Sequence, residues 1–164
     1  MEVMRIELPQ GRQATIETMA IMAERVRWAA STEQVRDAAI DLIQGVYCSG
    51  PADYVRAVDA FCRRWIMVID EPDEILICPL KMLDDIKAGR AAGDCDDTSM
   101  IAAALLSAIG IQCRFKAISP SREFGHFQHV FVEYRLGEGL PWRTLDVTIA
   151  GEPVYDFDWV VQEI

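Results

Sequence analysis

The segment "AAGDCDDTSMIAAALLSAIG", residues 91–110, places one cysteine among three aspartates at the start of an apolar stretch. Asp94 is a favourable N-cap residue, and the two aspartates after the cysteine fall where a helix favours negative charge, so the pattern predicts a helix starting near Cys95. The rest of this helix, 100–109, is almost wholly apolar, which is typical of a helix buried on most sides. We therefore expect the first turn to open into a cleft, with the Cys95 thiol facing it.

Composition limits the class of protein around this helix. The 164 residues are 51% apolar and 26% charged, as in a soluble globular protein, and they carry a formal net charge of -10. Nucleic acids and anionic membranes bind basic surfaces, so neither is an expected partner. No apolar run approaches the roughly 20 residues of a membrane span, and the first residues lack the pattern of a signal peptide. We expect one domain, 1–164, with a helical part at 1–90 and a catalytic core at 91–150.

The five cysteines favour a reducing compartment. Their number is odd and no CxxC pair occurs, which argues against a disulfide framework and suggests a cytoplasmic protein. The four cysteines other than Cys95 lie at apolar, periodic positions and are interpreted as core packing. These four are Cys48, Cys62, Cys78 and Cys113.

The two halves of the chain differ in periodicity, and this difference predicts the fold class. Helical spacing of apolar residues is found in the first half, and β-rich, partly alternating segments follow the Cys95 helix. Helices are predicted within 15–30, 31–43, 49–65 and 80–89. Strands are predicted within 111–118, 129–136 and 142–149. Helices followed by a run of strands indicate an α+β fold in which the Cys95 helix packs on an antiparallel sheet.

The position of Cys95 suggests chemistry. Free N–H groups and the dipole at a helix N-terminus favour a thiolate, and the same N–H groups can hold a developing oxyanion. Asp94, Asp96 and Asp97 oppose this, because nearby negative charge raises a thiol pKa. A nucleophilic Cys95 therefore needs a cationic neighbour such as an imidazolium. On this basis we predict a lowered Cys95 pKa.

Only two histidines are available, and one of them lies where a base is needed. His129 begins the predicted strand "HVFVEY", and Asp146 lies at the matching place in "WRTLDV" on the next strand. Cys95, His129 and Asp146 would form a nucleophile, a base and the carboxylate that orients the base. His126 is interpreted as a loop or rim residue.

Three motifs in this order resemble the transglutaminase-like superfamily of papain-fold cysteine enzymes. The motifs are "GDCDDTSMIAAALLSAIGIQCRF", "HVFVEY" and "WRTLDVT", and the resemblance covers about residues 60–150. The "GDCDD" variant after "IDEPDEILICP" is most similar to small members from bacteria, phages and prophages. The resemblance implies that Cys95 is the nucleophile, His129 the general base and acid, and Asp146 the orienting carboxylate.

The superfamily includes transglutaminases, peptidases and peptide N-glycanases, so the resemblance implies acyl transfer or hydrolysis at amide bonds of a protein or peptide substrate. It implies no metal or organic cofactor, and the oligomeric state stays open. Relatives often carry an oxyanion-stabilising aromatic residue at the place of Met67, so Trp65 is a weak candidate for that role. A backbone amide could serve alone.

Several alternatives stay open. His129 and Asp146 could form a purely structural pair, the three aspartates could serve only as helix caps, and Cys95 could be a packing residue. Cys95, His126, His129 and Asp146 could in principle bind zinc, although the spacing typical of a zinc site is absent. The chain could also be a non-catalytic module that kept the fold for protein binding or assembly, for example in a phage or prophage.

Overall fold

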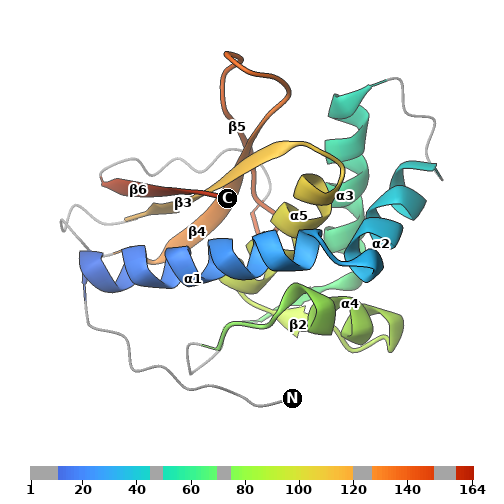
Figure 1. Ribbon diagram of the computed structural model, residues 1–164. Coiled ribbons are helices and arrows are strands. Elements are labelled where there is room, and N and C mark those ends of the chain that lie inside the picture. The colour runs from blue at the N-terminus through green and yellow to red at the C-terminus, as the bar shows by residue number, and fades with distance from the viewer. Residues whose placement is uncertain (1–10, 45–49, 70–74, 120–126, 150–157) are drawn as a thin grey trace.

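The protein is an α+β structure in which a helical layer packs against a four-stranded antiparallel sheet (Figure 1). The computed structural model describes residues 11–44, 50–69, 75–119, 127–149 and 158–164. The predicted fold class is therefore confirmed. The described helices and strands follow the order that the sequence predicts, helices first and the main sheet afterwards.

Five helices lie within the described residues, and they include all four predicted in the first half and the Cys95 helix. They are α1 (Arg12–Ala30), α2 (Glu33–Gln44), α3 (Pro51–Trp65), α4 (Pro79–Lys87) and α5 (Cys95–Ala108). Their ends follow local signals. The Thr32 hydroxyl accepts the Val35 N–H at 3.4 Å at the start of α2. Gly89 and Gly110, both with positive φ, follow α4 and α5 and allow the chain to turn away.

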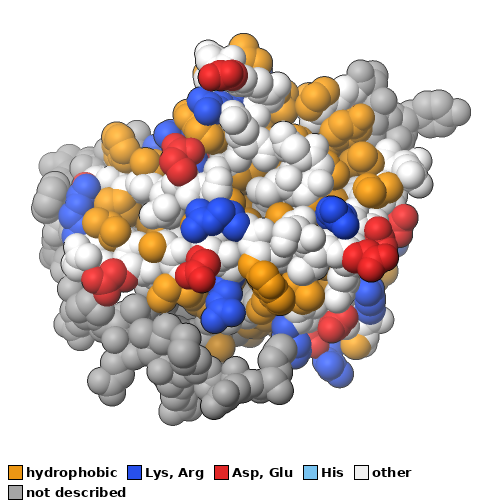
Figure 2. Space-filling model, in the orientation of Figure 1, with side chains coloured by type: hydrophobic (Ala, Val, Ile, Leu, Met, Phe, Trp, Pro, Cys, Tyr) orange, Lys and Arg blue, Asp and Glu red, His pale blue; other side chains and the backbone are white. Residues whose placement is uncertain are grey.

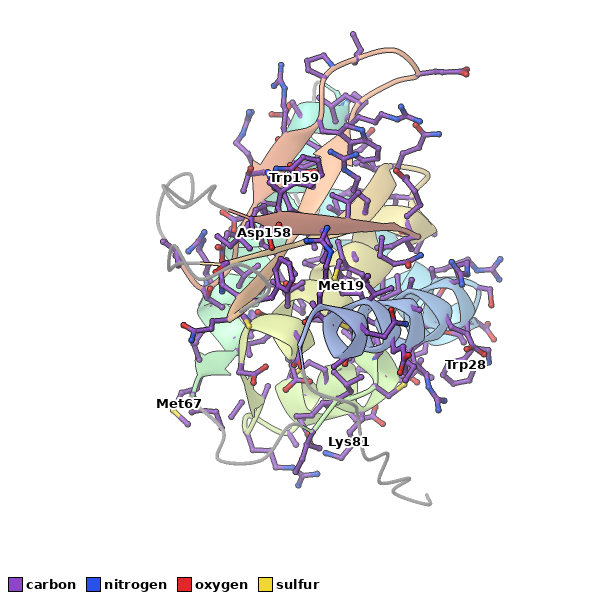
Figure 3. All side chains as sticks on the ribbon, turned by 90° about the vertical axis from the view of Figure 1, so that its left-hand side faces the viewer. Met19, Trp28, Met67, Lys81, Asp158 and Trp159 are labelled. Atoms are coloured by element: carbon purple, nitrogen blue, oxygen red, sulfur yellow. The ribbon has the colours of Figure 1, made fainter. Side chains whose placement is uncertain are left out.

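Helix α5 is the centre of the molecule. It packs against α1, α2, α3 and α4 and against strands β3 (Gln112–Ile118) and β4 (His129–Arg135). Each side chain from Met100 to Leu106 has 0% exposure, as expected for a helix enclosed on nearly all sides. Side chains of neighbouring elements complete this core, for example Met19 of α1, which Figure 3 labels beside the sheet. The apolar composition of α5 therefore reflects its central position.

The sheet has the strand order β5-β4-β3-β6, with every neighbouring pair antiparallel. Strand β5 is Arg143–Leu145 and β6 is Trp159–Glu163. The predicted strands correspond to β3, β4 and β5, but β5 is shorter than the predicted segment 142–149 because the chain turns after Leu145. Strand β6 was not predicted. It completes the edge beside β3, with Trp159 opposite Ile118.

A separate pair of short parallel strands lies at the entrance to α5. Strand β1 (Met67–Val68) pairs with β2 (Ala92–Gly93), and the Ile69 N–H donates to the Gly93 carbonyl at 3.0 Å. Two-residue strands have no periodicity to detect, and the sequence did not predict them. This pairing fixes the chain immediately before Cys95.

The surface carries charges of both signs. On the face shown in Figure 2, Lys and Arg side chains alternate with Asp and Glu around α1, without a large area of one sign. None of the helices within the described ranges is both long enough and apolar enough to cross a membrane.

Candidate active site

Cys95 is the first residue of α5, as the sequence predicts. Its side chain is partly exposed, whereas the helix that follows is buried. The Asp94 carboxylate accepts the Asp96 N–H at 3.1 Å and so caps the helix from the predicted position. The thiol is thus held at a capped helix N-terminus and not sealed in the core.

The glycine and the last aspartate of "GDCDD" fit closely together. A Cβ atom on Gly93 would lie 2.6 Å from Asp97 Oδ2 and 2.7 Å from Asp97 Cβ, so only glycine fits here without a shift. Asp97 is fully buried, and its Oδ1 accepts the Ile77 N–H at 2.6 Å. Asp97 therefore joins the start of α5 to the segment before α4, a role that helix capping alone does not predict.

His129 and Asp146 form a hydrogen-bonded pair. His129 Nε2 lies 2.5 Å from Asp146 Oδ2, and the two side chains are 15% and 2% exposed. His129 begins β4, and Asp146 follows the last residue of β5, whose Leu145 pairs with Val132 of β4. Burial by itself would raise the Asp146 pKa, but hydrogen bonds from His129 and Thr148 and the charge of His129 lower it. Asp146 is therefore ionised at neutral pH.

The first turn of α5 contacts β4 one residue beyond His129. A hydrogen bond links the Cys95 sulfur to the Val130 backbone, and the Ser99 hydroxyl donates to the Val130 carbonyl at 3.2 Å. Residues four apart lie on the same helix face, so Cys95 and Ser99 approach the strand together. The sequence analysis did not identify Ser99, although its spacing from Cys95 places it on the face of α5 that carries the thiol.

The electrostatic environment of Cys95 differs from the prediction. Burial is the main cause that raises its pKa, to about 12, and the charges of Asp94, Asp96 and Asp146 raise it further. The hydrogen bond with Val130 lowers the pKa but does not outweigh these effects. The predicted lowered pKa is therefore wrong. A raised pKa favours the neutral thiol at this position in the resting protein. The prediction failed because the sequence pattern shows the helix N-terminus but not the extent of burial.

The remaining candidates lie in different surroundings. Trp65 ends α3, is 47% exposed, and has the Arg64 guanidinium 5.0 Å from its ring centroid. Met67, where the sequence resemblance implies an aromatic residue, is 64% exposed on β1, and Figure 3 shows it at the periphery of the molecule. Nothing in these surroundings places either side chain at the thiol.

The other cysteines and the second histidine can now be assigned. Cys62 and Cys113 are buried, which confirms the packing interpretation for both, and Cys78 is partly exposed. Cys48 and His126 lie outside the described residues.

Acidic side chains near the thiol form one tight group. One carboxylate oxygen from each of Asp94, Asp96 and Asp97 lies within 4.8 Å of the others. Two of these carboxylates already have structural partners, because Asp94 caps α5 and Asp97 binds Ile77. Among the described residues, the candidate zinc ligands Cys95, His129 and Asp146 do not gather within the same distance.

Neither protein-family models nor curated protein sequences match this chain. Solved structures do resemble it, and two of them serve as examples. One is a "putative cysteine protease" from Cytophaga hutchinsonii, with a TM-score of 0.54, 18% identity and 71% of this chain covered. The other is a "putative protease" from Parabacteroides distasonis, with a TM-score of 0.56, 13% identity and 79% covered.

This likeness and the arrangement of helices and sheet together identify the fold as that of papain-like cysteine proteases. This chain spans 37% and 28% of the lengths of those two proteins.

Proposed function

We propose that the protein is a small transglutaminase-like enzyme that attacks amide or related acyl groups through Cys95, with His129 as base and Asp146 as the orienting carboxylate. One observation carries the proposal. His129, which is hydrogen-bonded to Asp146, immediately precedes Val130 in β4, and the Val130 backbone forms a hydrogen bond with the Cys95 sulfur. A nucleophile, a base and an acceptor for the base thus come from α5, β4 and the end of β5.

The Asp146 bond assigns the roles of the two imidazole nitrogens. An ionised carboxylate only accepts hydrogen bonds, so the 2.5 Å contact requires a proton on His129 Nε2. Neutral His129 then has its lone pair on Nδ1. In the first step the Cys95 proton passes to Nδ1 while the sulfur attacks the substrate carbonyl carbon.

The start of α5 supplies the donor for the oxyanion that this attack creates. The Asp96 N–H already donates to Asp94, which leaves the Cys95 N–H as the backbone donor next to the sulfur. His129 then gives its proton to the leaving amine as the carbon–nitrogen bond breaks. An acyl-thioester on Cys95 remains, and water or a second amine resolves it.

The raised Cys95 pKa defines how this enzyme would work. The raised pKa favours the neutral thiol over a preformed thiolate–imidazolium pair, so in this proposal proton transfer to His129 accompanies the attack. Such a thiol would be slow towards simple alkylating reagents and faster towards a substrate bound with its carbonyl at the Cys95 N–H.

The substrate would be a protein or peptide, and the chemistry needs no metal or organic cofactor. Hydrolysis would make the protein a peptidase or amidase, and transfer to an amine would make it a transglutaminase. The difference depends on how well the bound acyl group is protected from water.

The test is a screen of amide and peptide substrates, each with and without an amine acceptor, analysed by mass spectrometry. Cys95→Ala is the matched control. We expect conversion of at least one substrate class by the wild type and none by the variant. Conversion by both proteins would contradict the proposal.

A second candidate is a non-catalytic module for protein binding or assembly, and two observations favour it. Burial raises the Cys95 pKa to about 12, which disfavours a thiolate at rest. The apolar side chains of Met67 and Val68 are 64% and 48% exposed on β1, as in a surface used for contact. This candidate predicts that Cys95→Ala leaves partner binding unchanged and that no substrate in the screen is converted.

A further inference from the structure

The segment that carries Asp146 is folded around its own carboxylate. Asp146 Oδ1 accepts the Thr148 N–H at 2.9 Å, the Thr148 hydroxyl at 2.7 Å and the Ile149 N–H at 3.2 Å. These bonds use the N–H groups of the turn and leave its carbonyls in need of other donors. Oδ2, the second carboxylate oxygen, is the one that binds His129.

A single arginine supplies those donors. The Arg63 guanidinium donates to the carbonyl of Asp146, to that of Val147 at 3.0 Å and to that of Ile149 at 3.1 Å. Its Nε donates to Asp59 Oδ1 at 2.9 Å, one helical turn earlier in α3. All three guanidinium nitrogens are therefore engaged, and the planar group spans the turn from end to end.

Helix α3 connects this arginine to the nucleophile. Val55, Val58 and Cys62 of α3 are buried, and α3 packs against α5, whose first residue is Cys95. Figure 1 shows α3 beside α5 in the helical layer. The Asp146 turn is thus held by the same layer that holds Cys95, and not only by its short strand β5.

We propose that Arg63 is a positioning residue that holds the Asp146 turn so that Oδ2 meets His129 Nε2. This inference rests on the proposed function. Because β5 ends at Leu145, its pairing with β4 does not reach Asp146, and the three carbonyl bonds replace it. A lysine has a single ammonium and lacks the planar fork that reaches three carbonyls at once.

The experiment compares Arg63→Lys with Arg64→Lys, which changes the neighbouring arginine whose guanidinium lies over Trp65. Acetylation of Cys95 by p-nitrophenyl acetate is followed by intact-mass spectrometry at a temperature where all proteins are folded. We expect Arg63→Lys to slow acetylation roughly 10–100-fold, since small displacements of catalytic groups have effects of this size. Arg64→Lys should stay within about twofold of wild type.

A second readout separates positioning from simple structural support. The proton in the 2.5 Å His129–Asp146 bond should give a far-downfield ¹H resonance in the wild type, identified by its loss in Asp146→Asn. We expect this resonance to shift or broaden in Arg63→Lys and to stay unchanged in Arg64→Lys. A folded Arg63→Lys protein with the wild-type resonance and wild-type rate would overturn the inference.

The two proposals fail in different ways. Acetylation that persists in Cys95→Ala would defeat the proposed function itself. Acetylation that requires Cys95 but is unaffected by Arg63→Lys would leave the function standing and defeat only the role of Arg63. If Arg63→Lys does not fold, Asp59→Ala replaces it, because this variant removes only the acceptor of Nε. A rate decrease of about threefold would support the inference, and an unchanged rate would overturn it.

Discussion

The two ends of α5 each lie beside a cysteine, and burial raises the pKa of both thiols, but only one of the two thiols also has carboxylates nearby. Cys113, at the start of β3, is buried, and its thiol is hydrogen-bonded to the Ser107 side chain near the end of α5. Burial raises its pKa to about 12. Cys95 is partly exposed, but burial is again the main cause that raises its pKa to about 12, and the charges of Asp94, Asp96 and Asp146 add to it. Packing makes Cys113 inert, whereas Cys95 is hydrogen-bonded to Val130, the residue that follows His129, its proposed base.

Removing each sulfur in turn is the strongest test of whether Cys95 and Cys113 have different roles. Cys95→Ala should lower turnover by roughly 10³-fold or more, because the step it removes has no substitute. Cys113→Ala should keep turnover within about twofold and lower the free energy of unfolding by about 1 kcal/mol. Kinetic assays and urea denaturation of both variants measure these effects. Loss of turnover in Cys113→Ala but not in Cys95→Ala would contradict the assignment of Cys95 as the nucleophile.

The close fit at the Cys95 end predicts a large effect on stability. Gly93→Ala should lower the free energy of unfolding by about 1–3 kcal/mol, because its Cβ would overlap the buried Asp97 side chain. Gly50→Ala is the matched control, since its Cβ would meet no atom within 4 Å, and it should cost at most about 0.5 kcal/mol. Equal losses in urea denaturation would show that the approach of Gly93 to Asp97 is not a constraint.

Low pH should lower the free energy of unfolding, because Asp146, near the Cys95 end of α5, becomes protonated. The Asp146 pKa is lowered in the folded state, so its contribution is complete above the ordinary aspartate value of about 3.9. This contribution is lost as the pH falls through the lower, folded-state pKa. Asp146→Asn should therefore be less stable than wild type by roughly 1–3 kcal/mol at pH 7, with a smaller difference at low pH. A difference that stays constant from pH 7 to pH 3 in urea denaturation would rule out an ionised Asp146 as its source.

The smallest expected effect comes from removing one of the negative charges that distinguish the surroundings of Cys95 from those of Cys113. Asp94→Asn keeps a good N-cap but removes one negative charge beside the thiol. It should lower the Cys95 pKa and speed alkylation by iodoacetamide about threefold at pH 8. Peptide mapping should find the Cys113 rate unchanged. Equal acceleration at both cysteines would indicate a general loosening of the structure.

The sequence predicts those parts of the fold that have local signals. Asp94 marks the start of α5, and Gly110 marks the turn after it, so both ends of the central helix could be located to within two residues. His129 could be placed at the start of β4 from its β-rich segment, but Asp146, predicted on the next strand, lies one residue beyond the end of β5. Strand β6 was missed because it forms an edge whose pairing with β3 depends on tertiary structure.

The parts of the site that were missed depend on contacts between distant segments. Asp97 could be assigned only to helix capping, since its partner Ile77 lies 20 residues earlier. Arg63 lies 83 residues before Asp146, and in the sequence it is one of two adjacent arginines near the end of a helix. The Cys95 pKa was mispredicted because the dipole of a helix can be inferred from its cap, whereas burial depends on the whole fold.

The central claim is that Cys95 is a nucleophile served by His129, and one rate comparison tests it most directly. Wild type and His129→Ala are treated with p-nitrophenyl acetate, and the acetyl group is located and timed by peptide mapping. The account predicts acetylation of Cys95 in the wild type at least roughly 10²-fold faster than in His129→Ala. Equal rates in the two proteins, or an acetyl group on another residue, would contradict it.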